Sequence, residues 1–168
     1  MKKYVIPVIA LIALVTIISF RANPKLSVDG AWTIAEVQTI KANGDRTSVF
    51  PKESQVLFTG NNYSFAWTSH TTTQRSWQMT DSARLSRLNQ TIVNDGTFEL
   101  VDSILYTKAV FAMNPMFVDG LAKFKCSFNG DTLILTGVSL ASSENILHPV
   151  YAGGSHIVNK LVSAKRPK

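Results

Sequence analysis

The sequence has few of the residues on which disulfide bonding, metal binding and common catalytic centres depend. Cys126 is its single cysteine, so no disulfide bond can form within the chain. The three histidines, His70, His148 and His156, are scattered, and none belongs to the paired Cys/His spacing of a zinc site. The chain also lacks G-x-S-x-G, H-E-x-x-H and a closely spaced pair of acids. We therefore predict no metal and no cofactor, and we assign no catalytic residue.

Most of the chain carries little net charge, although the formal total is +6. Four of the 17 basic residues, Lys2, Lys3, Arg21 and Lys25, lie in the first 28 residues, where there is no acid. The remainder holds 13 basic residues against 11 acidic ones, and three of those basic residues lie in the tail at 164–168. A nucleic-acid-binding domain carries its positive charge on its folded surface. This distribution argues against nucleic acid as a partner.

Residues 1–22 are predicted to be a signal peptide or an N-terminal membrane anchor. Lys2 and Lys3 precede 17 uncharged residues that end at Phe20. Cleavage after Ala22 would place the bulky Phe20 three residues before the cut, where a small residue is preferred, so an uncleaved anchor is the alternative. Both alternatives predict a domain outside the cytoplasm. Residues 23–28 are expected to form a linker.

The segment from Gly96 to Gly137 has the pattern of four antiparallel β-strands joined by short turns. Its third run alternates most clearly, with one set of residues predicted to face a core and the other to face water: Ala122, Phe124, Cys126 and Phe128 against Lys123, Lys125 and Ser127. Asn129-Gly130 is a typical hairpin turn, and Leu133 and Leu135 continue the inward set on the returning strand. The segment predicts an antiparallel meander.

Further strands are predicted on both sides of this meander. The expected runs are Gly30 to Ile40, Gln55 to Thr59, Tyr63 to Ser69, Thr71 to Met79 and His156 to Ser163. Short connections and the absence of a βαβ pattern favour a closed barrel, which has no edge strands. We predict that residues 29–163 form an all-β domain, a single antiparallel up-and-down β-barrel of about eight to ten strands with one helix. A basic tail follows at 164–168.

One helix is predicted within the domain, from Thr80 to Asn94. Thr80 or Asp81 can cap its start, and Asn94-Asp95-Gly96 is a plausible end. Leu85, Leu88 and Ile92 recur with helical spacing. We expect this apolar stripe to pack against the sheet or across one end of the barrel.

Several motifs resemble known families. Gly30-Ala31-Trp32 resembles the lipocalin G-x-W signature, and the stretch from Thr80 to Thr136 resembles the bacterial lipocalin-like domain family. Within that stretch the similar elements are a helix, G-T-F-E from Gly96, Asn114-Pro115 and N-G-D-T-L from Asn129. The resemblance implies a calycin barrel in which Gly30 and Trp32 are structural and Trp32 packs at the closed end. It also implies a basic side chain over Trp32, for which Lys160 and Arg166 are the candidates.

The candidate ligand-binding residues are aromatic side chains with a few polar anchors, chosen by residue type and strand parity. A small-molecule site needs apolar walls and a few polar groups. Tyr63, Phe65 and Trp67 share one strand face, which either lines a cavity or forms core; without further evidence the pattern favours core. The predicted set is Glu36, Gln38, Tyr63, Phe65, Trp67, Arg75, Trp77, Phe98, Tyr106 and Phe124.

Three functions fit this sequence. The favoured hypothesis is a non-enzymatic, extracytoplasmic protein that binds a small, largely apolar molecule inside the barrel. The first alternative is a barrel filled by its own side chains that acts as a structural or protein-interaction domain at the cell envelope. The second is a lipocalin-like cyclase, hydratase or isomerase, in which Glu36 would act with Tyr106 or His70, provided that both face the lumen. The oligomeric state is left open.

Overall fold

A computed structural model describes residues 26–69 and 76–164 of the chain. The predicted signal peptide or anchor, the candidate Arg75 and the basic residues of the tail lie outside the described residues.

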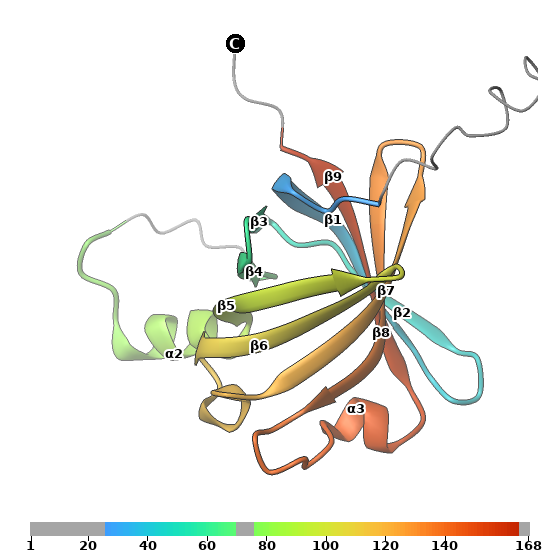
Figure 1. Cartoon of the computed structure of the whole chain (residues 1–168). Helices are drawn as coiled ribbons and strands as arrows, with labels where there is room; N and C mark the ends of the chain where they lie inside the picture. Colours follow the sequence, from blue (N-terminus) through green and yellow to red (C-terminus); the bar gives the residue numbers. More distant parts are fainter. Residues whose placement is uncertain (1–25, 70–75, 165–168) are drawn as a thin grey trace, which may run out of the picture.

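The strands form one antiparallel sheet that closes on itself (Figure 1). The strands are β1 (Gly30–Ile40), β2 (Arg46–Val49), β3 (Glu53–Thr59), β4 (Asn62–Thr68), β5 (Thr91–Val101), β6 (Ile104–Ala112), β7 (Leu121–Asn129), β8 (Thr132–Ala141) and β9 (His156–Ser163). Each strand from β3 onward pairs with the next, and β9 returns to pair with β1. The prediction of an antiparallel, up-and-down barrel is confirmed, with eight strand positions around the wall.

Strands β2 and β3 together occupy one of these eight positions, because both pair with the same edge of β1. The first residues of β1 pair with β3, and its last residues pair with β2. Pro51 lies between β2 and β3, and proline has no N–H to donate to a ladder. At the interruption the Ser54 hydroxyl accepts a hydrogen bond from the backbone N–H of Ile34, at 2.9 Å. This side chain replaces a ladder bond and keeps the barrel wall closed.

The barrel interior follows the alternation that the sequence predicts. On β7, Ala122, Phe124 and Cys126 face inward, while Lys123 and Lys125 are exposed. Phe128, predicted to continue the inward set, is 41% exposed at the end of the strand. On the neighbouring strand Leu133 and Leu135 are fully buried. Because opposite walls contribute such rows, the interior is filled with apolar side chains over much of its length.

The end of the barrel near the N-terminus is closed around Trp32. This side chain is buried, its indole N–H donates to the Val28 carbonyl oxygen at 2.9 Å, and its ring lies 6.1 Å from that of Phe128. Among the described residues no basic side chain covers the ring. Lys160 points outward to Glu36, so this part of the lipocalin resemblance is wrong for Lys160, while Arg166 lies outside the described residues.

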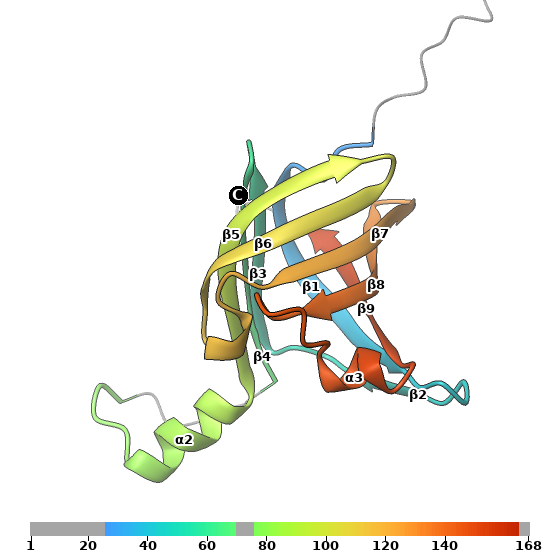
Figure 2. The same ribbon diagram turned by 60° about the horizontal axis from the view of Figure 1, so that its bottom comes forward.

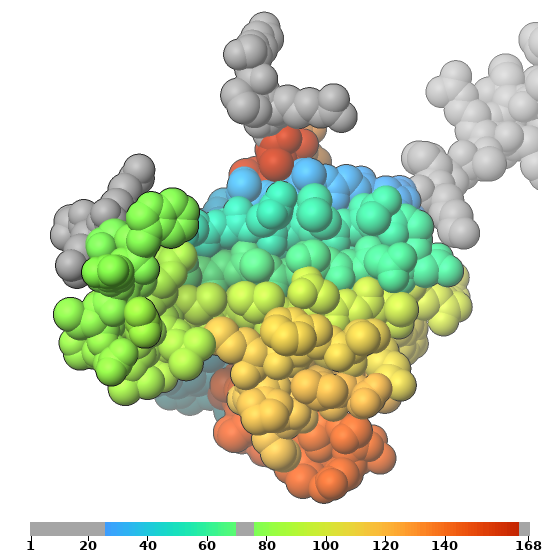
Figure 3. Space-filling model, turned by 90° about the vertical axis from the view of Figure 1, so that its left-hand side faces the viewer, coloured from blue at the N-terminus to red at the C-terminus, as the bar shows by residue number. Residues whose placement is uncertain are grey.

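The predicted helix exists but ends earlier and packs differently than expected. Helix α2 (Asp81–Asn89) begins as predicted, with the Thr80 hydroxyl accepting from the backbone N–H of Ala83. From Thr91 onward the chain is β5, because β-branched residues there pair with β4. Leu85 and Leu88 are more than half exposed, and α2 projects from the barrel (Figures 2 and 3). The expectation that this stripe covers the barrel is therefore wrong.

Two other predictions about connections need correction. Residues 76–79 are not a strand, so the described part of the predicted Thr71 to Met79 strand is absent. The loop between β8 and β9 contains a short helix, α3 (Pro149–Ala152), which the sequence pattern did not predict. A 3₁₀ turn, η1 (Pro115–Phe117), lies between β6 and β7. Both η1 and α3 lie at the end of the barrel away from the start of β1 (Figures 1 and 2).

Candidate functional site: a cavity inside the barrel

A cavity of about 110 Å³ lies inside the barrel, toward the end opposite Trp32. Its walls come from every strand position and from the elements at that end. The lining residues are Val37, Phe58, Tyr63, Phe65, Trp67, Ile92, Asn94, Leu105, Thr107, Phe117, Ala122, Phe124, Leu135, Leu140, Tyr151, Ile157 and Asn159. Most of these side chains are apolar or aromatic. An engineered apolar cavity of about 150 Å³ holds benzene, so this cavity suits a molecule of about one small ring.

Helix α3 contributes one wall of the cavity through Tyr151. A Cβ atom at Gly137 would lie only 2.0 Å from the Tyr151 hydroxyl, so glycine allows the ring to lie against β8. Burial raises the pKa of Tyr151, and the nearby backbone of Ile157 acts in the opposite direction. His148 caps α3, its Nδ1 accepting from the Val150 N–H at 3.3 Å. Burial lowers the pKa of His148, which favours the neutral ring that this acceptor role requires.

Few polar groups face this apolar space, and none of the lining residues is charged. Asn94, Thr107 and Asn159 supply two amides and a hydroxyl, and Tyr63 and Tyr151 each supply a phenol. Burial raises the pKa of Tyr63 to about 12, and the negative charge of Asp95 acts in the same direction. The Tyr63 hydroxyl therefore stays protonated at physiological pH. The cavity can hold neutral molecules by apolar contact and by hydrogen bonds.

Five of the predicted ligand-binding residues point into the barrel, and four of them line the cavity. These four are Tyr63, Phe65, Trp67 and Phe124. Phe98 lies outside the cavity, where its ring meets that of Phe58 edge-on at 5.2 Å. The aromatic row of β4 thus serves both purposes that the sequence left open, since Tyr63 belongs to the buried core and also lines the cavity.

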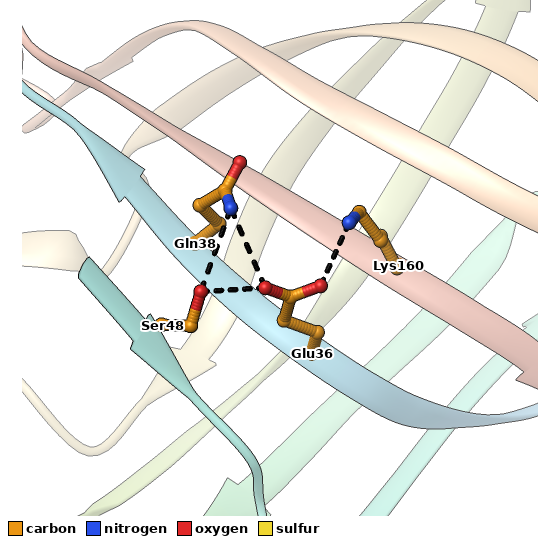
Figure 4. Close-up of polar contacts among 4 residues, drawn as sticks. All are labelled: Glu36, Gln38, Ser48 and Lys160. Atoms are coloured by element: carbon orange, nitrogen blue, oxygen red, sulfur yellow. Dashed lines mark hydrogen bonds and ion pairs between the residues drawn. The ribbon is translucent and has the colours of Figure 1, made fainter. Parts of the chain in front are cut away.

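Glu36 and Gln38 lie on the outer face of the barrel, not in its lumen (Figure 4). A β-bulge between Ile34 and Glu36 reverses the parity of β1, so Val37 faces inward in their place. Glu36 accepts hydrogen bonds from Lys160 Nζ at 2.7 Å and from the Ser48 hydroxyl at 2.5 Å. Glu36 and Gln38, which were predicted to bind the ligand, therefore do not reach the cavity.

Two further candidates also lie away from the cavity. Trp77 is fully exposed beside α2. Tyr106 lies on the outer face of β6, with Lys123 Nζ 5.6 Å from its ring centre. Because Glu36 and Tyr106 both face outward, they do not form the luminal acid–base pair of the enzyme hypothesis. His70, its other suggested partner, lies outside the described residues.

Sequence reasoning missed the polar lining residues and the two aromatics that close the cavity. Thr107 and Asn159 follow strand parity, since Thr107 lies between the buried Leu105 and Ala109, and Asn159 alternates with Ile157 and Leu161 on β9. That alternation was a usable signal. Phe117 and Tyr151 had no such signal, because they reach the lumen from η1 and α3 rather than from a strand.

Other reactive groups of the described chain form no further chemical site. Cys126 is buried, and burial raises the pKa of its thiol to about 11, which keeps it protonated and unreactive. The described ranges contain no group of three or more His, Cys, Asp or Glu residues that could hold a metal ion.

The Glu36–Lys160 ion pair predicts a pH-dependent contribution to stability. Hydrogen bonds from Lys160 and then from Ser48 lower the pKa of Glu36 below its ordinary 4.5. The resulting stabilisation is fully present above the ordinary pKa and is lost as the pH falls through the lowered pKa of the folded protein. Glu36→Gln should therefore lower the free energy of unfolding at pH 7, by no more than about 1 kcal/mol because Lys160 is partly exposed, and less at pH 3.

Urea denaturation of both proteins at pH 7 and pH 3 measures this difference. Glu99→Gln is the matched control, since Glu99 is exposed and has no ion pair within residues 26–69 and 76–164. An effect of Glu36→Gln that is equal at the two pH values would contradict the assigned role of the pair.

Comparison with known proteins does not assign this chain to a family. The closed, eight-stranded antiparallel barrel is compatible with the calycin type of fold that the motifs imply. No protein-family model, no curated protein and no solved structure matches the chain. Within the part of the chain that the structure describes, no helix is long and apolar enough to cross a membrane.

Proposed function

We propose that this protein is a non-enzymatic binding protein that holds one small, uncharged, largely apolar molecule inside its barrel. The observation that carries the proposal is the cavity itself, with its aromatic walls, its few polar groups and its lack of charged lining residues. Binding pockets for small molecules have this composition. The size of the cavity favours a compact ligand over a long fatty acid or a retinoid.

The fold and the motifs support a lipocalin-like assignment within this proposal. Gly30 precedes the buried Trp32 at the start of β1, and Trp32 closes the end of the barrel opposite the cavity. Lipocalin-like barrels use the same division between a closed end and a binding end. We also propose that the protein acts outside the cytoplasm, on the basis of the apolar run that ends at Phe20.

Native mass spectrometry of the protein purified from its own cell envelope, combined with organic extraction, tests the proposed function. A co-purifying neutral molecule at close to one per chain would support it and identify the ligand class. A ligand-free mass, together with no binding of small cyclic compounds by NMR titration, would contradict it. The filled-barrel alternative, a structural or interaction domain at the envelope, predicts that second result.

A further inference from the structure

The Tyr63 hydroxyl is a buried polar group without a hydrogen-bond partner among the described residues. Tyr63 is only 5% exposed, and its side chain lines the barrel cavity. The Thr107 hydroxyl is close enough to influence the pKa of Tyr63, but the two do not form a hydrogen bond of acceptable geometry. Buried hydroxyls in folded proteins nearly always have a partner, so this group points to one that enters the cavity.

A molecule that fills the cavity either forms a hydrogen bond with the Tyr63 hydroxyl or leaves that hydroxyl without a partner. Leaving it unpaired costs free energy, because the group has lost water and gained nothing in return. Tyr63 remains neutral at physiological pH, with a pKa of about 12, so its hydroxyl has a proton to donate. The best complement is therefore an uncharged oxygen acceptor on the ligand.

The surroundings of Tyr63 exclude an anionic acceptor. None of the residues that line the cavity is a lysine, an arginine or a histidine. Asp95 lies near enough for its negative charge to raise the pKa of Tyr63, and it would repel a second negative charge. A carboxylate placed here would be desolvated without a counter-ion, which is strongly unfavourable.

We propose that the barrel selects small cyclic carbonyl compounds, and that Tyr63 recognises them by donating a hydrogen bond from its hydroxyl to the carbonyl oxygen. This inference rests on the proposed function, since it names the class of molecule that the cavity holds. The aromatic side chains Phe65, Trp67 and Phe124 contact the hydrocarbon ring. Thr107 lies next to Tyr63 and provides the second polar group at this point of the wall.

The test compares two probes of nearly the same shape, cyclopentanone and methylenecyclopentane, which differ by one oxygen in place of one CH₂ group. Their dissociation constants are measured on the full chain by NMR titration, for the wild type and for Tyr63→Phe. Removal of the hydroxyl should reduce the preference for the ketone over the alkene by about tenfold. Cyclopentanecarboxylate should bind the wild type at least about tenfold more weakly than the ketone.

Tyr151→Phe is the matched control. Tyr151 also lines the cavity, but its hydroxyl lies against β8 at Gly137 and, unlike that of Tyr63, is not a buried group without a partner among the described residues. Its removal should leave the ketone-to-alkene ratio unchanged. If Tyr63→Phe does not fold, the ¹³Cζ shift of Tyr63 in the wild type replaces it: the ketone should move this signal, and the alkene should not.

The outcomes separate the two proposals. If both probes bind and Tyr63→Phe leaves their ratio unchanged, the role of Tyr63 is overturned while the binding function stands. If Tyr63→Phe and Tyr151→Phe reduce the ratio equally, the effect is not specific to Tyr63 and the inference also fails. If neither probe binds the wild type, the proposed binding function fails together with the inference.

Discussion

Gly96→Ala is expected to lower the free energy of unfolding by about 3 kcal/mol or more, the largest effect on stability that we predict for a single methyl group. Gly96 lies on β5 beside a β-bulge, where the strand crosses close to β6. A Cβ atom at this position would lie 2.0 Å from the Lys108 carbonyl oxygen and 2.9 Å from the Val110 nitrogen. These are backbone atoms of a paired strand, so they cannot move aside as a flexible side chain would.

Thermal unfolding followed by circular dichroism measures this effect. A loss of that size corresponds to a fall in the midpoint of about 10 °C for a domain of this length. Gly153→Ala is the control, because a Cβ atom there has its nearest contact at 3.5 Å and the backbone has an ordinary negative φ. Similar midpoints for both variants would show that β5 and β6 do not approach as closely as described.

Ala122→Leu is expected to abolish ligand binding while the barrel stays folded. Ala122 is buried on β7, opposite Thr107 of β6, and it lines the cavity. A leucine side chain at this position would occupy much of the roughly 110 Å³ that a ligand needs. We expect the affinity for cyclopentanone to fall by at least about tenfold, because overlap with a bound ring costs more than about 1.4 kcal/mol.

The same titration and an unfolding curve test this prediction together. Filling an existing cavity adds buried apolar surface, so Ala122→Leu should not lower the unfolding midpoint. Ala109→Leu provides the contrast: Ala109 is fully buried on β6 but does not line the cavity, so the larger side chain should destabilise the fold by about 1–3 kcal/mol. Unchanged cyclopentanone affinity in Ala122→Leu would place the ligand elsewhere.

The alternation of apolar and polar residues predicted most of the inward-facing positions, because each strand has one solvent-exposed face and one buried face. The row from Tyr63 on β4 and the residues Ala122, Phe124 and Cys126 on β7 face inward as predicted, whereas Phe128 at the end of β7 is 41% exposed. Strand β9 has the predicted bounds of His156–Ser163. A period of two is a local property of the chain, and burial of one face preserves it. The cavity residues Tyr63, Phe65, Trp67 and Phe124 were within reach of sequence reasoning for this reason.

The prediction of inward-facing residues from alternation was wrong where a β-bulge changed which residues of the strand face the core. The bulge after Ile34 turns Glu36 outward to Lys160, although a regular strand would place both Ile34 and Glu36 on the inner face. Helical spacing failed in a similar way at Ile92, whose position relative to Leu85 and Leu88 fits a helix. Pairing of Ile92 with Trp67 of β4 determines its conformation instead. Contacts with a distant strand outweighed the local pattern.

The sequence by itself determined the class of fold, the direction of most strand faces and the lack of a metal-binding or catalytic motif. These features follow from the types of residue and from the alternation of inward and outward side chains along each strand, which is visible among residues close together in the sequence. Only the tertiary structure decided that a cavity remains, that Phe117 and Tyr151 close one side of it, and that the Tyr63 hydroxyl has no partner within the described residues. Such features depend on how side chains from opposite walls and from loops fill one shared volume, which no local pattern encodes.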